Sequence, residues 1–261
     1  MRRVTSASPV PTAVVTGATG GIGEHLVYRL IARGYRVLAV GRSEERLAEV
    51  VDLACGAAAS QSGGDGPPRG ARGADPATGT VVPVIWDQAA KRDVPEPLRS
   101  LPEVDVLVHN AAVGDVVAVA DTTPESWTEV WEVNVASAGR LTAALLPALR
   151  LGAGHVILVN AAPGVTGVPK WSGYVATKAA LREFADSLRA EESASGVRVT
   201  SVFPPATATD LLERVRTAFG RDYDPATLVA PSSAAAMILS VLDHPRDAYA
   251  EELLIGGTGV R

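Results

Sequence analysis

The chain has 261 residues, an ordinary length for one α/β domain. Hydrophobic residues make up 47% and charged residues 20%, a composition that supports a buried core and excludes an intrinsically disordered chain. The net charge of −5 argues against a nucleic-acid partner, which would need a basic surface. The single cysteine, Cys55, excludes an intramolecular disulfide and argues against a cysteine-based metal site, so we expect no metal and a reducing, cytoplasmic location.

The first residues hold two arginines but lack the apolar segment of a signal peptide. No apolar run reaches the length of a membrane helix, so we expect no membrane partner. The sequence therefore predicts a flexible arm at 1–11 and a single dinucleotide-binding and catalytic domain at 12–261.

Seven apolar segments predict strands that are buried on both faces, because they are continuous rather than alternating. These segments are 12–17, 36–41, 80–86, 104–110, 155–160, 197–203 and 252–257. Helical patterns at 22–33, 124–150, 174–194 and 231–243 lie between most of them. The alternation of strand and helix predicts an α/β fold, a Rossmann-like doubly wound parallel sheet of about seven strands. Ligands of such sheets bind beyond the carboxyl ends of the strands.

Three further local signals follow from the sequence. Thr123 is the expected N-cap of the long helix, with Pro124 at its first position. A Gly-, Ala- and Pro-rich segment at about 55–79 predicts a mobile surface insertion. The segment at about 206–229 is expected to close the substrate pocket as a lid. Its apolar residues could form the inner face of a lid helix or pack as in any other helix; they are Leu211, Leu212, Val215 and Phe219.

The segment "TGATGGIG" (16–23) follows the first strand and opens the first helix. Glycines at this place let the backbone turn tightly and let a pyrophosphate approach the free N–H groups of the helix N-terminus. The predicted cofactor cradle comprises Gly17, Thr19, Gly21, Ile22 and Gly23. After the second strand comes Gly41-Arg42, where an acidic residue would bind a ribose hydroxyl. An arginine suits a 2′-phosphate, so the sequence favours NADP(H) over NAD(H), although Arg42 could also be a plain surface residue.

Tyr174 and Lys178 lie four residues apart in a predicted helix, and therefore on one helical face. A phenol with an ordinary pKa near 10 is a weak base at neutral pH. A neighbouring ammonium stabilises the phenolate, so we expect Lys178 to lower the pKa of Tyr174. The pair predicts proton transfer to or from a carbonyl or alcohol oxygen.

Together these motifs resemble the short-chain dehydrogenase/reductase family, from about residue 12 to the end of the chain. The carrying segments are "TGATGGIG", "HNAAV" (109–113, where the family shows Asn-Asn-Ala-Gly), Asn134, "YVATK" (174–178) and "FPPATATDL" (203–211, where the family shows Pro-Gly). The resemblance implies an NADP-dependent oxidoreductase acting on a small carbonyl or secondary alcohol. It also implies a homodimer or homotetramer, formed through the helices at 124–150 and 174–194.

The resemblance further implies roles for single residues. It gives Tyr174 as general acid/base, Lys178 as its partner at the nicotinamide ribose, and Asn134 as the residue that holds a relay water. Asp87 would contact the adenine, Asn110 and Ala111 the adenosine channel, and Thr207 and Thr209 the nicotinamide amide or the phosphates. An apolar or aromatic substrate is expected from the residues that would line its pocket, namely Val113, Val168, Trp171, Pro204 and Leu211.

One member of the family's catalytic group is missing. The family places a substrate-binding serine thirteen residues before the tyrosine, and here that position is Ala161. Three explanations stay open. The first is an engineered Ser→Ala variant, and the second is replacement of the hydroxyl by Asn160, Thr166 or Ser172. The third is a catalytically impaired NADP(H)-binding regulator or scaffold.

Overall fold

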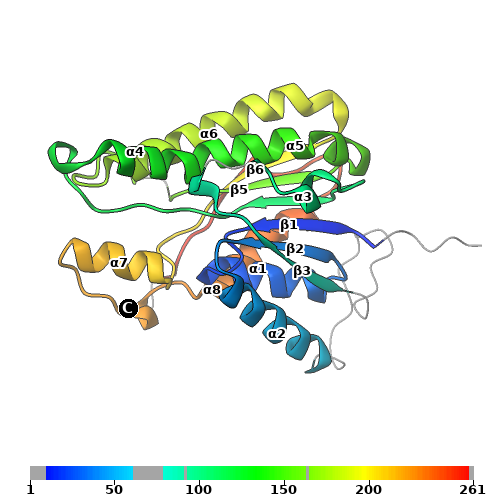
Figure 1. Cartoon of the computed structure of the whole chain (residues 1–261), viewed down its shortest axis with the longest axis horizontal. Coiled ribbons are helices and arrows are strands. Elements are labelled where there is room, and N and C mark those ends of the chain that lie inside the picture. Colours follow the sequence, from blue (N-terminus) through cyan, green and yellow to red (C-terminus); the bar gives the residue numbers. More distant parts are fainter. Residues whose placement is uncertain (1–9, 61–78, 91–92, 163–164, 259–261) are drawn as a thin grey trace, which may run out of the picture.

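The computed structural model describes residues 10–60, 79–90, 93–162 and 165–258. In that part of the chain seven parallel strands form one sheet in the order β3-β2-β1-β4-β5-β6-β7 (Figure 1). The strands are β1 (Thr12–Thr16), β2 (Arg36–Gly41), β3 (Thr80–Ile85), β4 (Val106–His109), β5 (His155–Val159), β6 (Arg198–Phe203) and β7 (Glu252–Leu254). The predicted Rossmann-like parallel sheet is confirmed.

Helices cover both faces of the sheet (Figure 1). On one face lie α1 (Gly21–Ala32), α2 (Glu44–Ser60) and α8 (Pro231–Leu239). On the other lie α3 (Glu96–Arg99), α5 (Ser137–Gly152) and α6 (Ser172–Glu192). The helix α4 (Pro124–Trp131) leads into α5, and α7 (Asp210–Ala218) stands apart from both layers. None of these helices, within the residues that are described, is long and apolar enough to cross a bilayer.

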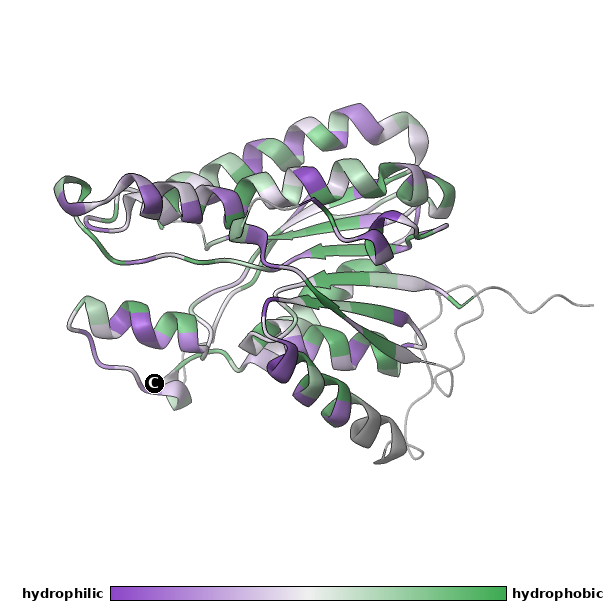
Figure 2. Cartoon of the chain, in the orientation of Figure 1, coloured by the Kyte–Doolittle hydropathy of each residue, from purple (hydrophilic) through white to green (hydrophobic). Residues whose placement is uncertain are grey.

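The alternation of side chains along β1 explains why its sequence is apolar throughout. Ala13 and Val15 belong to the core cluster formed with α1, α2 and α8. Val14 points to the opposite face and belongs to the cluster formed with α3, α5 and α6. Both faces of the sheet are thus removed from water, and Figure 2 shows the strands as mostly hydrophobic ribbons between helices of mixed character.

The sheet reverses its order at β1, which pairs with β2 on one side and with β4 on the other. The loops that follow β1 and β4 therefore diverge from the sheet at neighbouring positions. This is the place where doubly wound sheets open a crevice for a ligand.

Two predicted boundaries change. The single helix expected at 124–150 is divided by a π-helical turn at Glu132–Ala136. The expected insertion at 55–79 begins later, because the alanine-rich residues 55–60 continue α2, as their high helix propensity allows. Its remainder at 61–78 lies outside the described residues, as does the arm at 1–9. The predicted N-cap is confirmed: the Thr123 hydroxyl accepts a hydrogen bond of 3.2 Å from the Ser126 N–H.

Candidate active site

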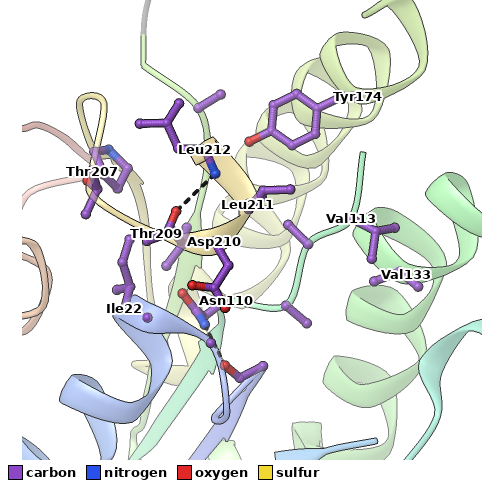
Figure 3. A pocket seen from close by; sticks show the side chains of 18 of the residues that line it. Ile22, Asn110, Val113, Val133, Tyr174, Thr207, Thr209, Asp210, Leu211 and Leu212 are labelled. Carbon is purple, nitrogen blue, oxygen red and sulfur yellow. Dashed lines mark hydrogen bonds between the residues drawn. The ribbon is translucent and has the colours of Figure 1, made fainter. Parts of the chain in front are cut away.

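A cavity of about 440 Å³ lies beyond the carboxyl ends of the strands. Residues that follow β1 to β6 line it, together with the start of α6 and the helix α7. Figure 3 shows Ile22 and Asn110 at one end, the Tyr174 hydroxyl turned inward, and Leu211 and Leu212 of α7 beside them. A volume of this size suits a ligand, for which pockets of roughly 300–1,000 Å³ are typical.

The loop after β1 is shaped by glycines. Gly17 has a φ of +63°, and a Cβ there would lie 2.8 Å from the Cα of Ala111. A Cβ on Gly23 would collide with the Gly17 carbonyl oxygen. Gly23 does not line the cavity, so its predicted contact with the cofactor is replaced by a packing role. The predicted residues Gly17, Thr19, Gly21 and Ile22 do line it.

The N-terminus of α1 fits a pyrophosphate. Its N-cap, Gly20, offers no side-chain hydrogen bond to the first turn. Gly20, Gly21 and Ile22 all line the cavity. The first N–H groups of a helix lack partners within the helix and favour an anion. These residues therefore fit the phosphates of a dinucleotide.

Asn110 holds the glycine loop rather than reaching into the cavity with a free amide. Its Nδ2 donates to the carbonyl oxygens of Thr16 at 3.2 Å and Gly17 at 3.1 Å. Both hydrogens of the amide are thus used within the protein. Asn110 and its neighbour Ala111 line the cavity as predicted, but the side chain of Asn110 acts as a brace.

Two arginines stand at the end of the cavity formed by β2 and α2. Arg42 and Arg46 both line it. Arg46, which sequence analysis missed, lies in the first turn of α2, directly after the loop that holds Arg42, and this closeness in sequence could have pointed to it. Its Nη2 is also 3.9 Å from an Asp210 carboxylate oxygen on α7. Asp87 lines the cavity as well, and one of its oxygens accepts a 3.0 Å hydrogen bond from the Ala89 N–H.

Tyr174 and Lys178 meet one turn apart on α6. The Lys178 Nζ lies 5.6 Å from the centre of the Tyr174 ring and donates to the Val159 carbonyl oxygen at 2.9 Å. Burial raises the pKa of Tyr174 to about 12 and lowers the pKa of Lys178 to about 8. The expected lowering of the tyrosine pKa by the lysine is therefore wrong for this structure. Removal of the phenol from water outweighs the neighbouring cation.

Asn134 lies behind Tyr174 and Lys178 and does not line the cavity. Its Oδ1 accepts from the Val113 N–H at 2.8 Å, and its Nδ2 donates to the Val113 carbonyl at 2.8 Å and to the Thr177 hydroxyl at 2.9 Å. The Thr177 hydroxyl in turn donates to the Tyr174 carbonyl oxygen at 2.7 Å. The side chain of Asn134 thus fixes the backbone at Tyr174, and its role with a relay water stays a prediction.

Ala161 lines the cavity between Asn160 and the α6 residues. Of the three residues considered as replacements for the missing serine, Asn160 lines the cavity, whereas Thr166 and Ser172 do not. Thr166 is exposed on the loop before α6. Of these three residues, Asn160 alone is therefore placed where it could replace the serine hydroxyl.

The substrate end of the cavity is apolar. Val113, Trp171, Pro204 and Leu211 line it as predicted. Val168 does not, because it lies in the turn closed by a hydrogen bond from the Trp171 N–H to its carbonyl oxygen. The Trp171 indole stacks on the Tyr174 ring, with centroids 4.3 Å apart and planes 8° apart. The indole also meets Phe219 at the end of α7, edge to face at 6.2 Å.

The start of α7 closes over the glycine loop. The Thr209 hydroxyl caps α7 by accepting from the Leu212 N–H at 3.3 Å (Figure 3). A Cβ on Gly21 would lie 3.0 Å from the Thr209 methyl group. The Thr207 hydroxyl donates to the Pro205 carbonyl oxygen at 2.8 Å. Both threonines line the cavity, with hydroxyls already engaged by their own loop, while Leu211, Leu212 and Val215 extend its apolar wall.

Gly114 allows the Tyr174 ring its position. A Cβ on Gly114 would lie 2.6 Å from the Tyr174 Cδ2, too close for two carbon atoms. We expect Gly114→Ala to displace the phenol and lower the kcat of any reaction that depends on this phenol about 10²-fold, since a misplacement near 1 Å has effects of that size. Steady-state kinetics would measure this. Gly256→Ala is the control, because a Cβ there meets nothing within 4 Å. Full activity of Gly114→Ala would contradict the expectation.

The profile of the short chain dehydrogenase family matches residues 11–62 and 76–219, and the chain belongs to this family. Dehydrogenase/reductase SDR family protein 7-like from Drosophila melanogaster is 31% identical over 222 residues, and Dehydrogenase/reductase SDR family member 7B from Bos taurus is 34% identical over 211 residues. These matches cover 82% and 80% of this chain but only 63% and 62% of the two relatives.

Solved structures share the fold. A closed form of serine dehydrogenase complexed with NADP+ superposes with a TM-score of 0.75 at 25% identity, covering 96% of this chain and 98% of the other. An alcohol dehydrogenase from Thermococcus sibiricus complexed with 5-hydroxy-NADP gives a TM-score of 0.73 at 23% identity, covering 94% and 95%. Within the described residues, no cluster of three or more His, Cys, Asp or Glu side chains is arranged to hold a metal ion.

Proposed function

We propose that this chain transfers a hydride between NADP(H) and a small carbonyl or secondary alcohol, with Tyr174 as the general acid/base. One observation carries the proposal: a single cavity is lined both by the phosphate-binding loop with Arg42 and by Tyr174 with Lys178. Cofactor and substrate could therefore meet within it. The cofactors named in the two solved structures above support the choice of a nicotinamide dinucleotide.

The residues that would hold the cofactor are those of the glycine loop, the two arginines at α2 and Lys178. When bound, its nicotinamide would supply the hydride that reaches the carbonyl carbon. Because the pKa of Tyr174 is about 12, the phenol is protonated at neutral pH and suited to give its proton to the substrate oxygen. With that hydride added to the carbonyl carbon, the π bond would break, the oxygen would take the Tyr174 proton, and a secondary alcohol would result.

Lys178 supports the charge that this proton transfer leaves behind. With a pKa of about 8 it is mostly an ammonium at neutral pH, one helical turn from the phenolate that forms. Its hydrogen bond to the Val159 carbonyl holds the ammonium on the inner side of α6. The phenolate regains a proton from solvent, and the opposite sequence of steps oxidises an alcohol.

The substrate that fits best is apolar. The wall beside Tyr174 is built from Val113, Trp171, Pro204 and the α7 leucines. Such side chains favour alkyl or aromatic groups next to the carbonyl. The test of the function is consumption of NADPH with a panel of aliphatic and aromatic ketones, and of NADP+ with the matching alcohols. Absence of turnover with every member of the panel would contradict the proposal.

The preference for NADP(H) rests on Arg42 and Arg46. A hydrogen bond to a charged group contributes about 1.5–3 kcal/mol. We therefore expect Arg42→Ser to raise the Kd for NADPH roughly 10- to 100-fold and to leave the Kd for NADH nearly unchanged. Quenching of tryptophan fluorescence in titrations without substrate would measure both constants. Arg99→Ser is the control, since Arg99 is exposed on α3 and does not line the cavity. Equal weakening for both cofactors would contradict a phosphate role.

A second function, an NADP(H)-binding regulator without turnover, is favoured by one observation. Ala161 offers no hydroxyl to a substrate at the position where the family's serine would stand. Tight NADPH binding in the fluorescence titration, together with no turnover of any ketone or alcohol, would distinguish this function from the first. The oligomeric state and the cellular location stay predictions.

A further inference from the structure

The side-chain amide of Asn160 is the most conspicuous unused hydrogen-bond donor beside Tyr174. Asn160 is only 6% exposed and lines the cavity that also contains Tyr174, Lys178 and Ala161. Among the described residues its Nδ2 is buried and has no hydrogen-bond partner. A buried donor without an acceptor is costly and calls for an explanation, such as a ligand that supplies the acceptor.

The rest of Asn160 is held in place. Its backbone N–H donates to the Val202 carbonyl oxygen at 2.7 Å, which continues the β5–β6 ladder by one residue. Its Oδ1 accepts from the Ala161 N–H at 2.9 Å. Because the Ala161 N–H needs an acceptor, this contact fixes which end of the amide is oxygen and leaves Nδ2 as the free end. The donor is therefore positioned by two contacts rather than loose.

We propose that the Asn160 Nδ2 donates a hydrogen bond to the carbonyl oxygen of the substrate, in place of the hydroxyl that Ala161 lacks. This inference rests on the proposed reductase function. A neutral amide cannot give up a proton at neutral pH, so Tyr174 remains the acid. Asn160 holds the carbonyl oxygen and strengthens its bond as negative charge develops there, which lowers the barrier more than it stabilises the bound ketone.

Two other cavity residues, Trp86 and Trp171, have a buried indole N–H without a partner among the described residues. Trp86 follows β3 and directly precedes Asp87, at the end of the cavity that is predicted to take the adenine, and the geometry of Trp171 is less suitable. The indole plane of Trp171 is nearly parallel to the phenol of Tyr174, with 4.3 Å between centroids. An oxygen that receives the Tyr174 proton lies near the phenol plane and is displaced from the indole plane. Trp171 therefore suits a packing role. The matched control is Ser201→Ala on β6, which removes a buried hydroxyl that has no hydrogen-bond partner among the described residues and lies outside the cavity lining.

The test compares kcat and KM for a ketone reduced by the wild-type chain, together with the NADPH Kd, in four variants. Asn160→Ala is expected to lower kcat/KM about 10²–10³-fold, mostly through kcat, with an unchanged NADPH Kd. Asn160→Asp keeps an acceptor for the Ala161 N–H but loses the donor, and should fall by at least as much. Asn160→Ala combined with Ala161→Ser should recover much of the loss. Ser201→Ala should stay within a few-fold of wild type.

Ala161→Ser alone does not depend on how Asn160 variants fold. If Asn160 already supplies the donor, the added hydroxyl raises kcat/KM no more than a few-fold. A gain of about 10²–10³-fold would show that the donor was absent and would overturn the inference. Near-wild-type activity of Asn160→Asp would overturn it as well, and both results would leave the reductase function intact. A wild-type chain that reduces no ketone would overturn the function first, and the inference with it.

Discussion

Replacement of Tyr174 with phenylalanine is expected to lower kcat for ketone reduction about 10²–10⁴-fold, the usual contribution of a positioned general acid. The new phenyl ring would retain the stacking on Trp171, so the pocket should keep its shape. What is lost is the proton that a phenol with a pKa of about 12 carries at neutral pH. Steady-state and single-turnover kinetics with NADPH would measure the effect, and the NADPH Kd should stay close to the wild-type value.

The control for this prediction is a second tyrosine, Tyr28, whose hydroxyl is buried away from the cavity. Tyr28 lies on α1, outside the cavity lining, and its hydroxyl has no hydrogen-bond partner among the described residues. Tyr28→Phe should therefore leave kcat unchanged and should not lower the melting temperature. A Tyr174→Phe variant with more than a tenth of wild-type kcat would contradict the assignment of Tyr174 as the acid.

Lys178→Met is expected to abolish most of the activity and, at the same time, to stabilise the fold. Burial lowers the pKa of Lys178 from its ordinary value of 10.5 to about 8, which corresponds to about 3 kcal/mol of unfavourable free energy at neutral pH. The methionine removes this cost but leaves the Val159 carbonyl without its donor, a loss of about 1 kcal/mol. The net gain in the free energy of unfolding should be about 2 kcal/mol.

The stability difference between Lys178→Met and the wild-type chain should depend on pH. Because the folded pKa of Lys178 lies below the unfolded one, the destabilisation is fully present below about pH 8 and disappears as the pH rises towards 10.5. The advantage of Lys178→Met should therefore be largest at neutral pH and shrink over that range. Urea unfolding at several pH values, followed by fluorescence, would measure it. A variant that is less stable than wild type at neutral pH would show that the lysine is not destabilising.

The strands and the general form of the site could be predicted because both depend on local patterns. Continuous apolar segments predicted strands that are buried on both faces, as the two core clusters show. The glycines after β1 predicted a close approach between backbone segments, which the structure shows between Gly17 and Ala111. The spacing of Tyr174 and Lys178 predicted that they share one helical face, as they do on α6. The break at Glu132–Ala136 could not be predicted, because a π-helical turn has no apolar period of its own.

The predictions about the site that were wrong depend on tertiary contacts, which the sequence does not contain. The pKa of Tyr174 follows from how completely the ring is removed from water, which the spacing of two residues does not contain. Val168 and Gly23 lie in the right motifs but do not line the cavity: Val168 is part of a turn, and Gly23 packs against the Gly17 carbonyl. No sequence motif pointed to Arg46, and the sequence left open whether Asn160, Thr166 or Ser172 replaces the serine hydroxyl. The importance of Arg46 and Asn160 comes from the cavity that brings distant loops together.

The contact between the start of α7 and the glycine loop has a kinetic consequence. Thr209 packs on Gly21, and Arg46 reaches Asp210 on the same helix, so one segment covers both the nucleotide end and the substrate end of the cavity. A dinucleotide bound as proposed would lie beneath this segment and would need it to lift before exchange, whereas a small ketone would need only the apolar end to open. We therefore expect an ordered sequence in which the dinucleotide binds first and leaves last, with its release setting the turnover rate.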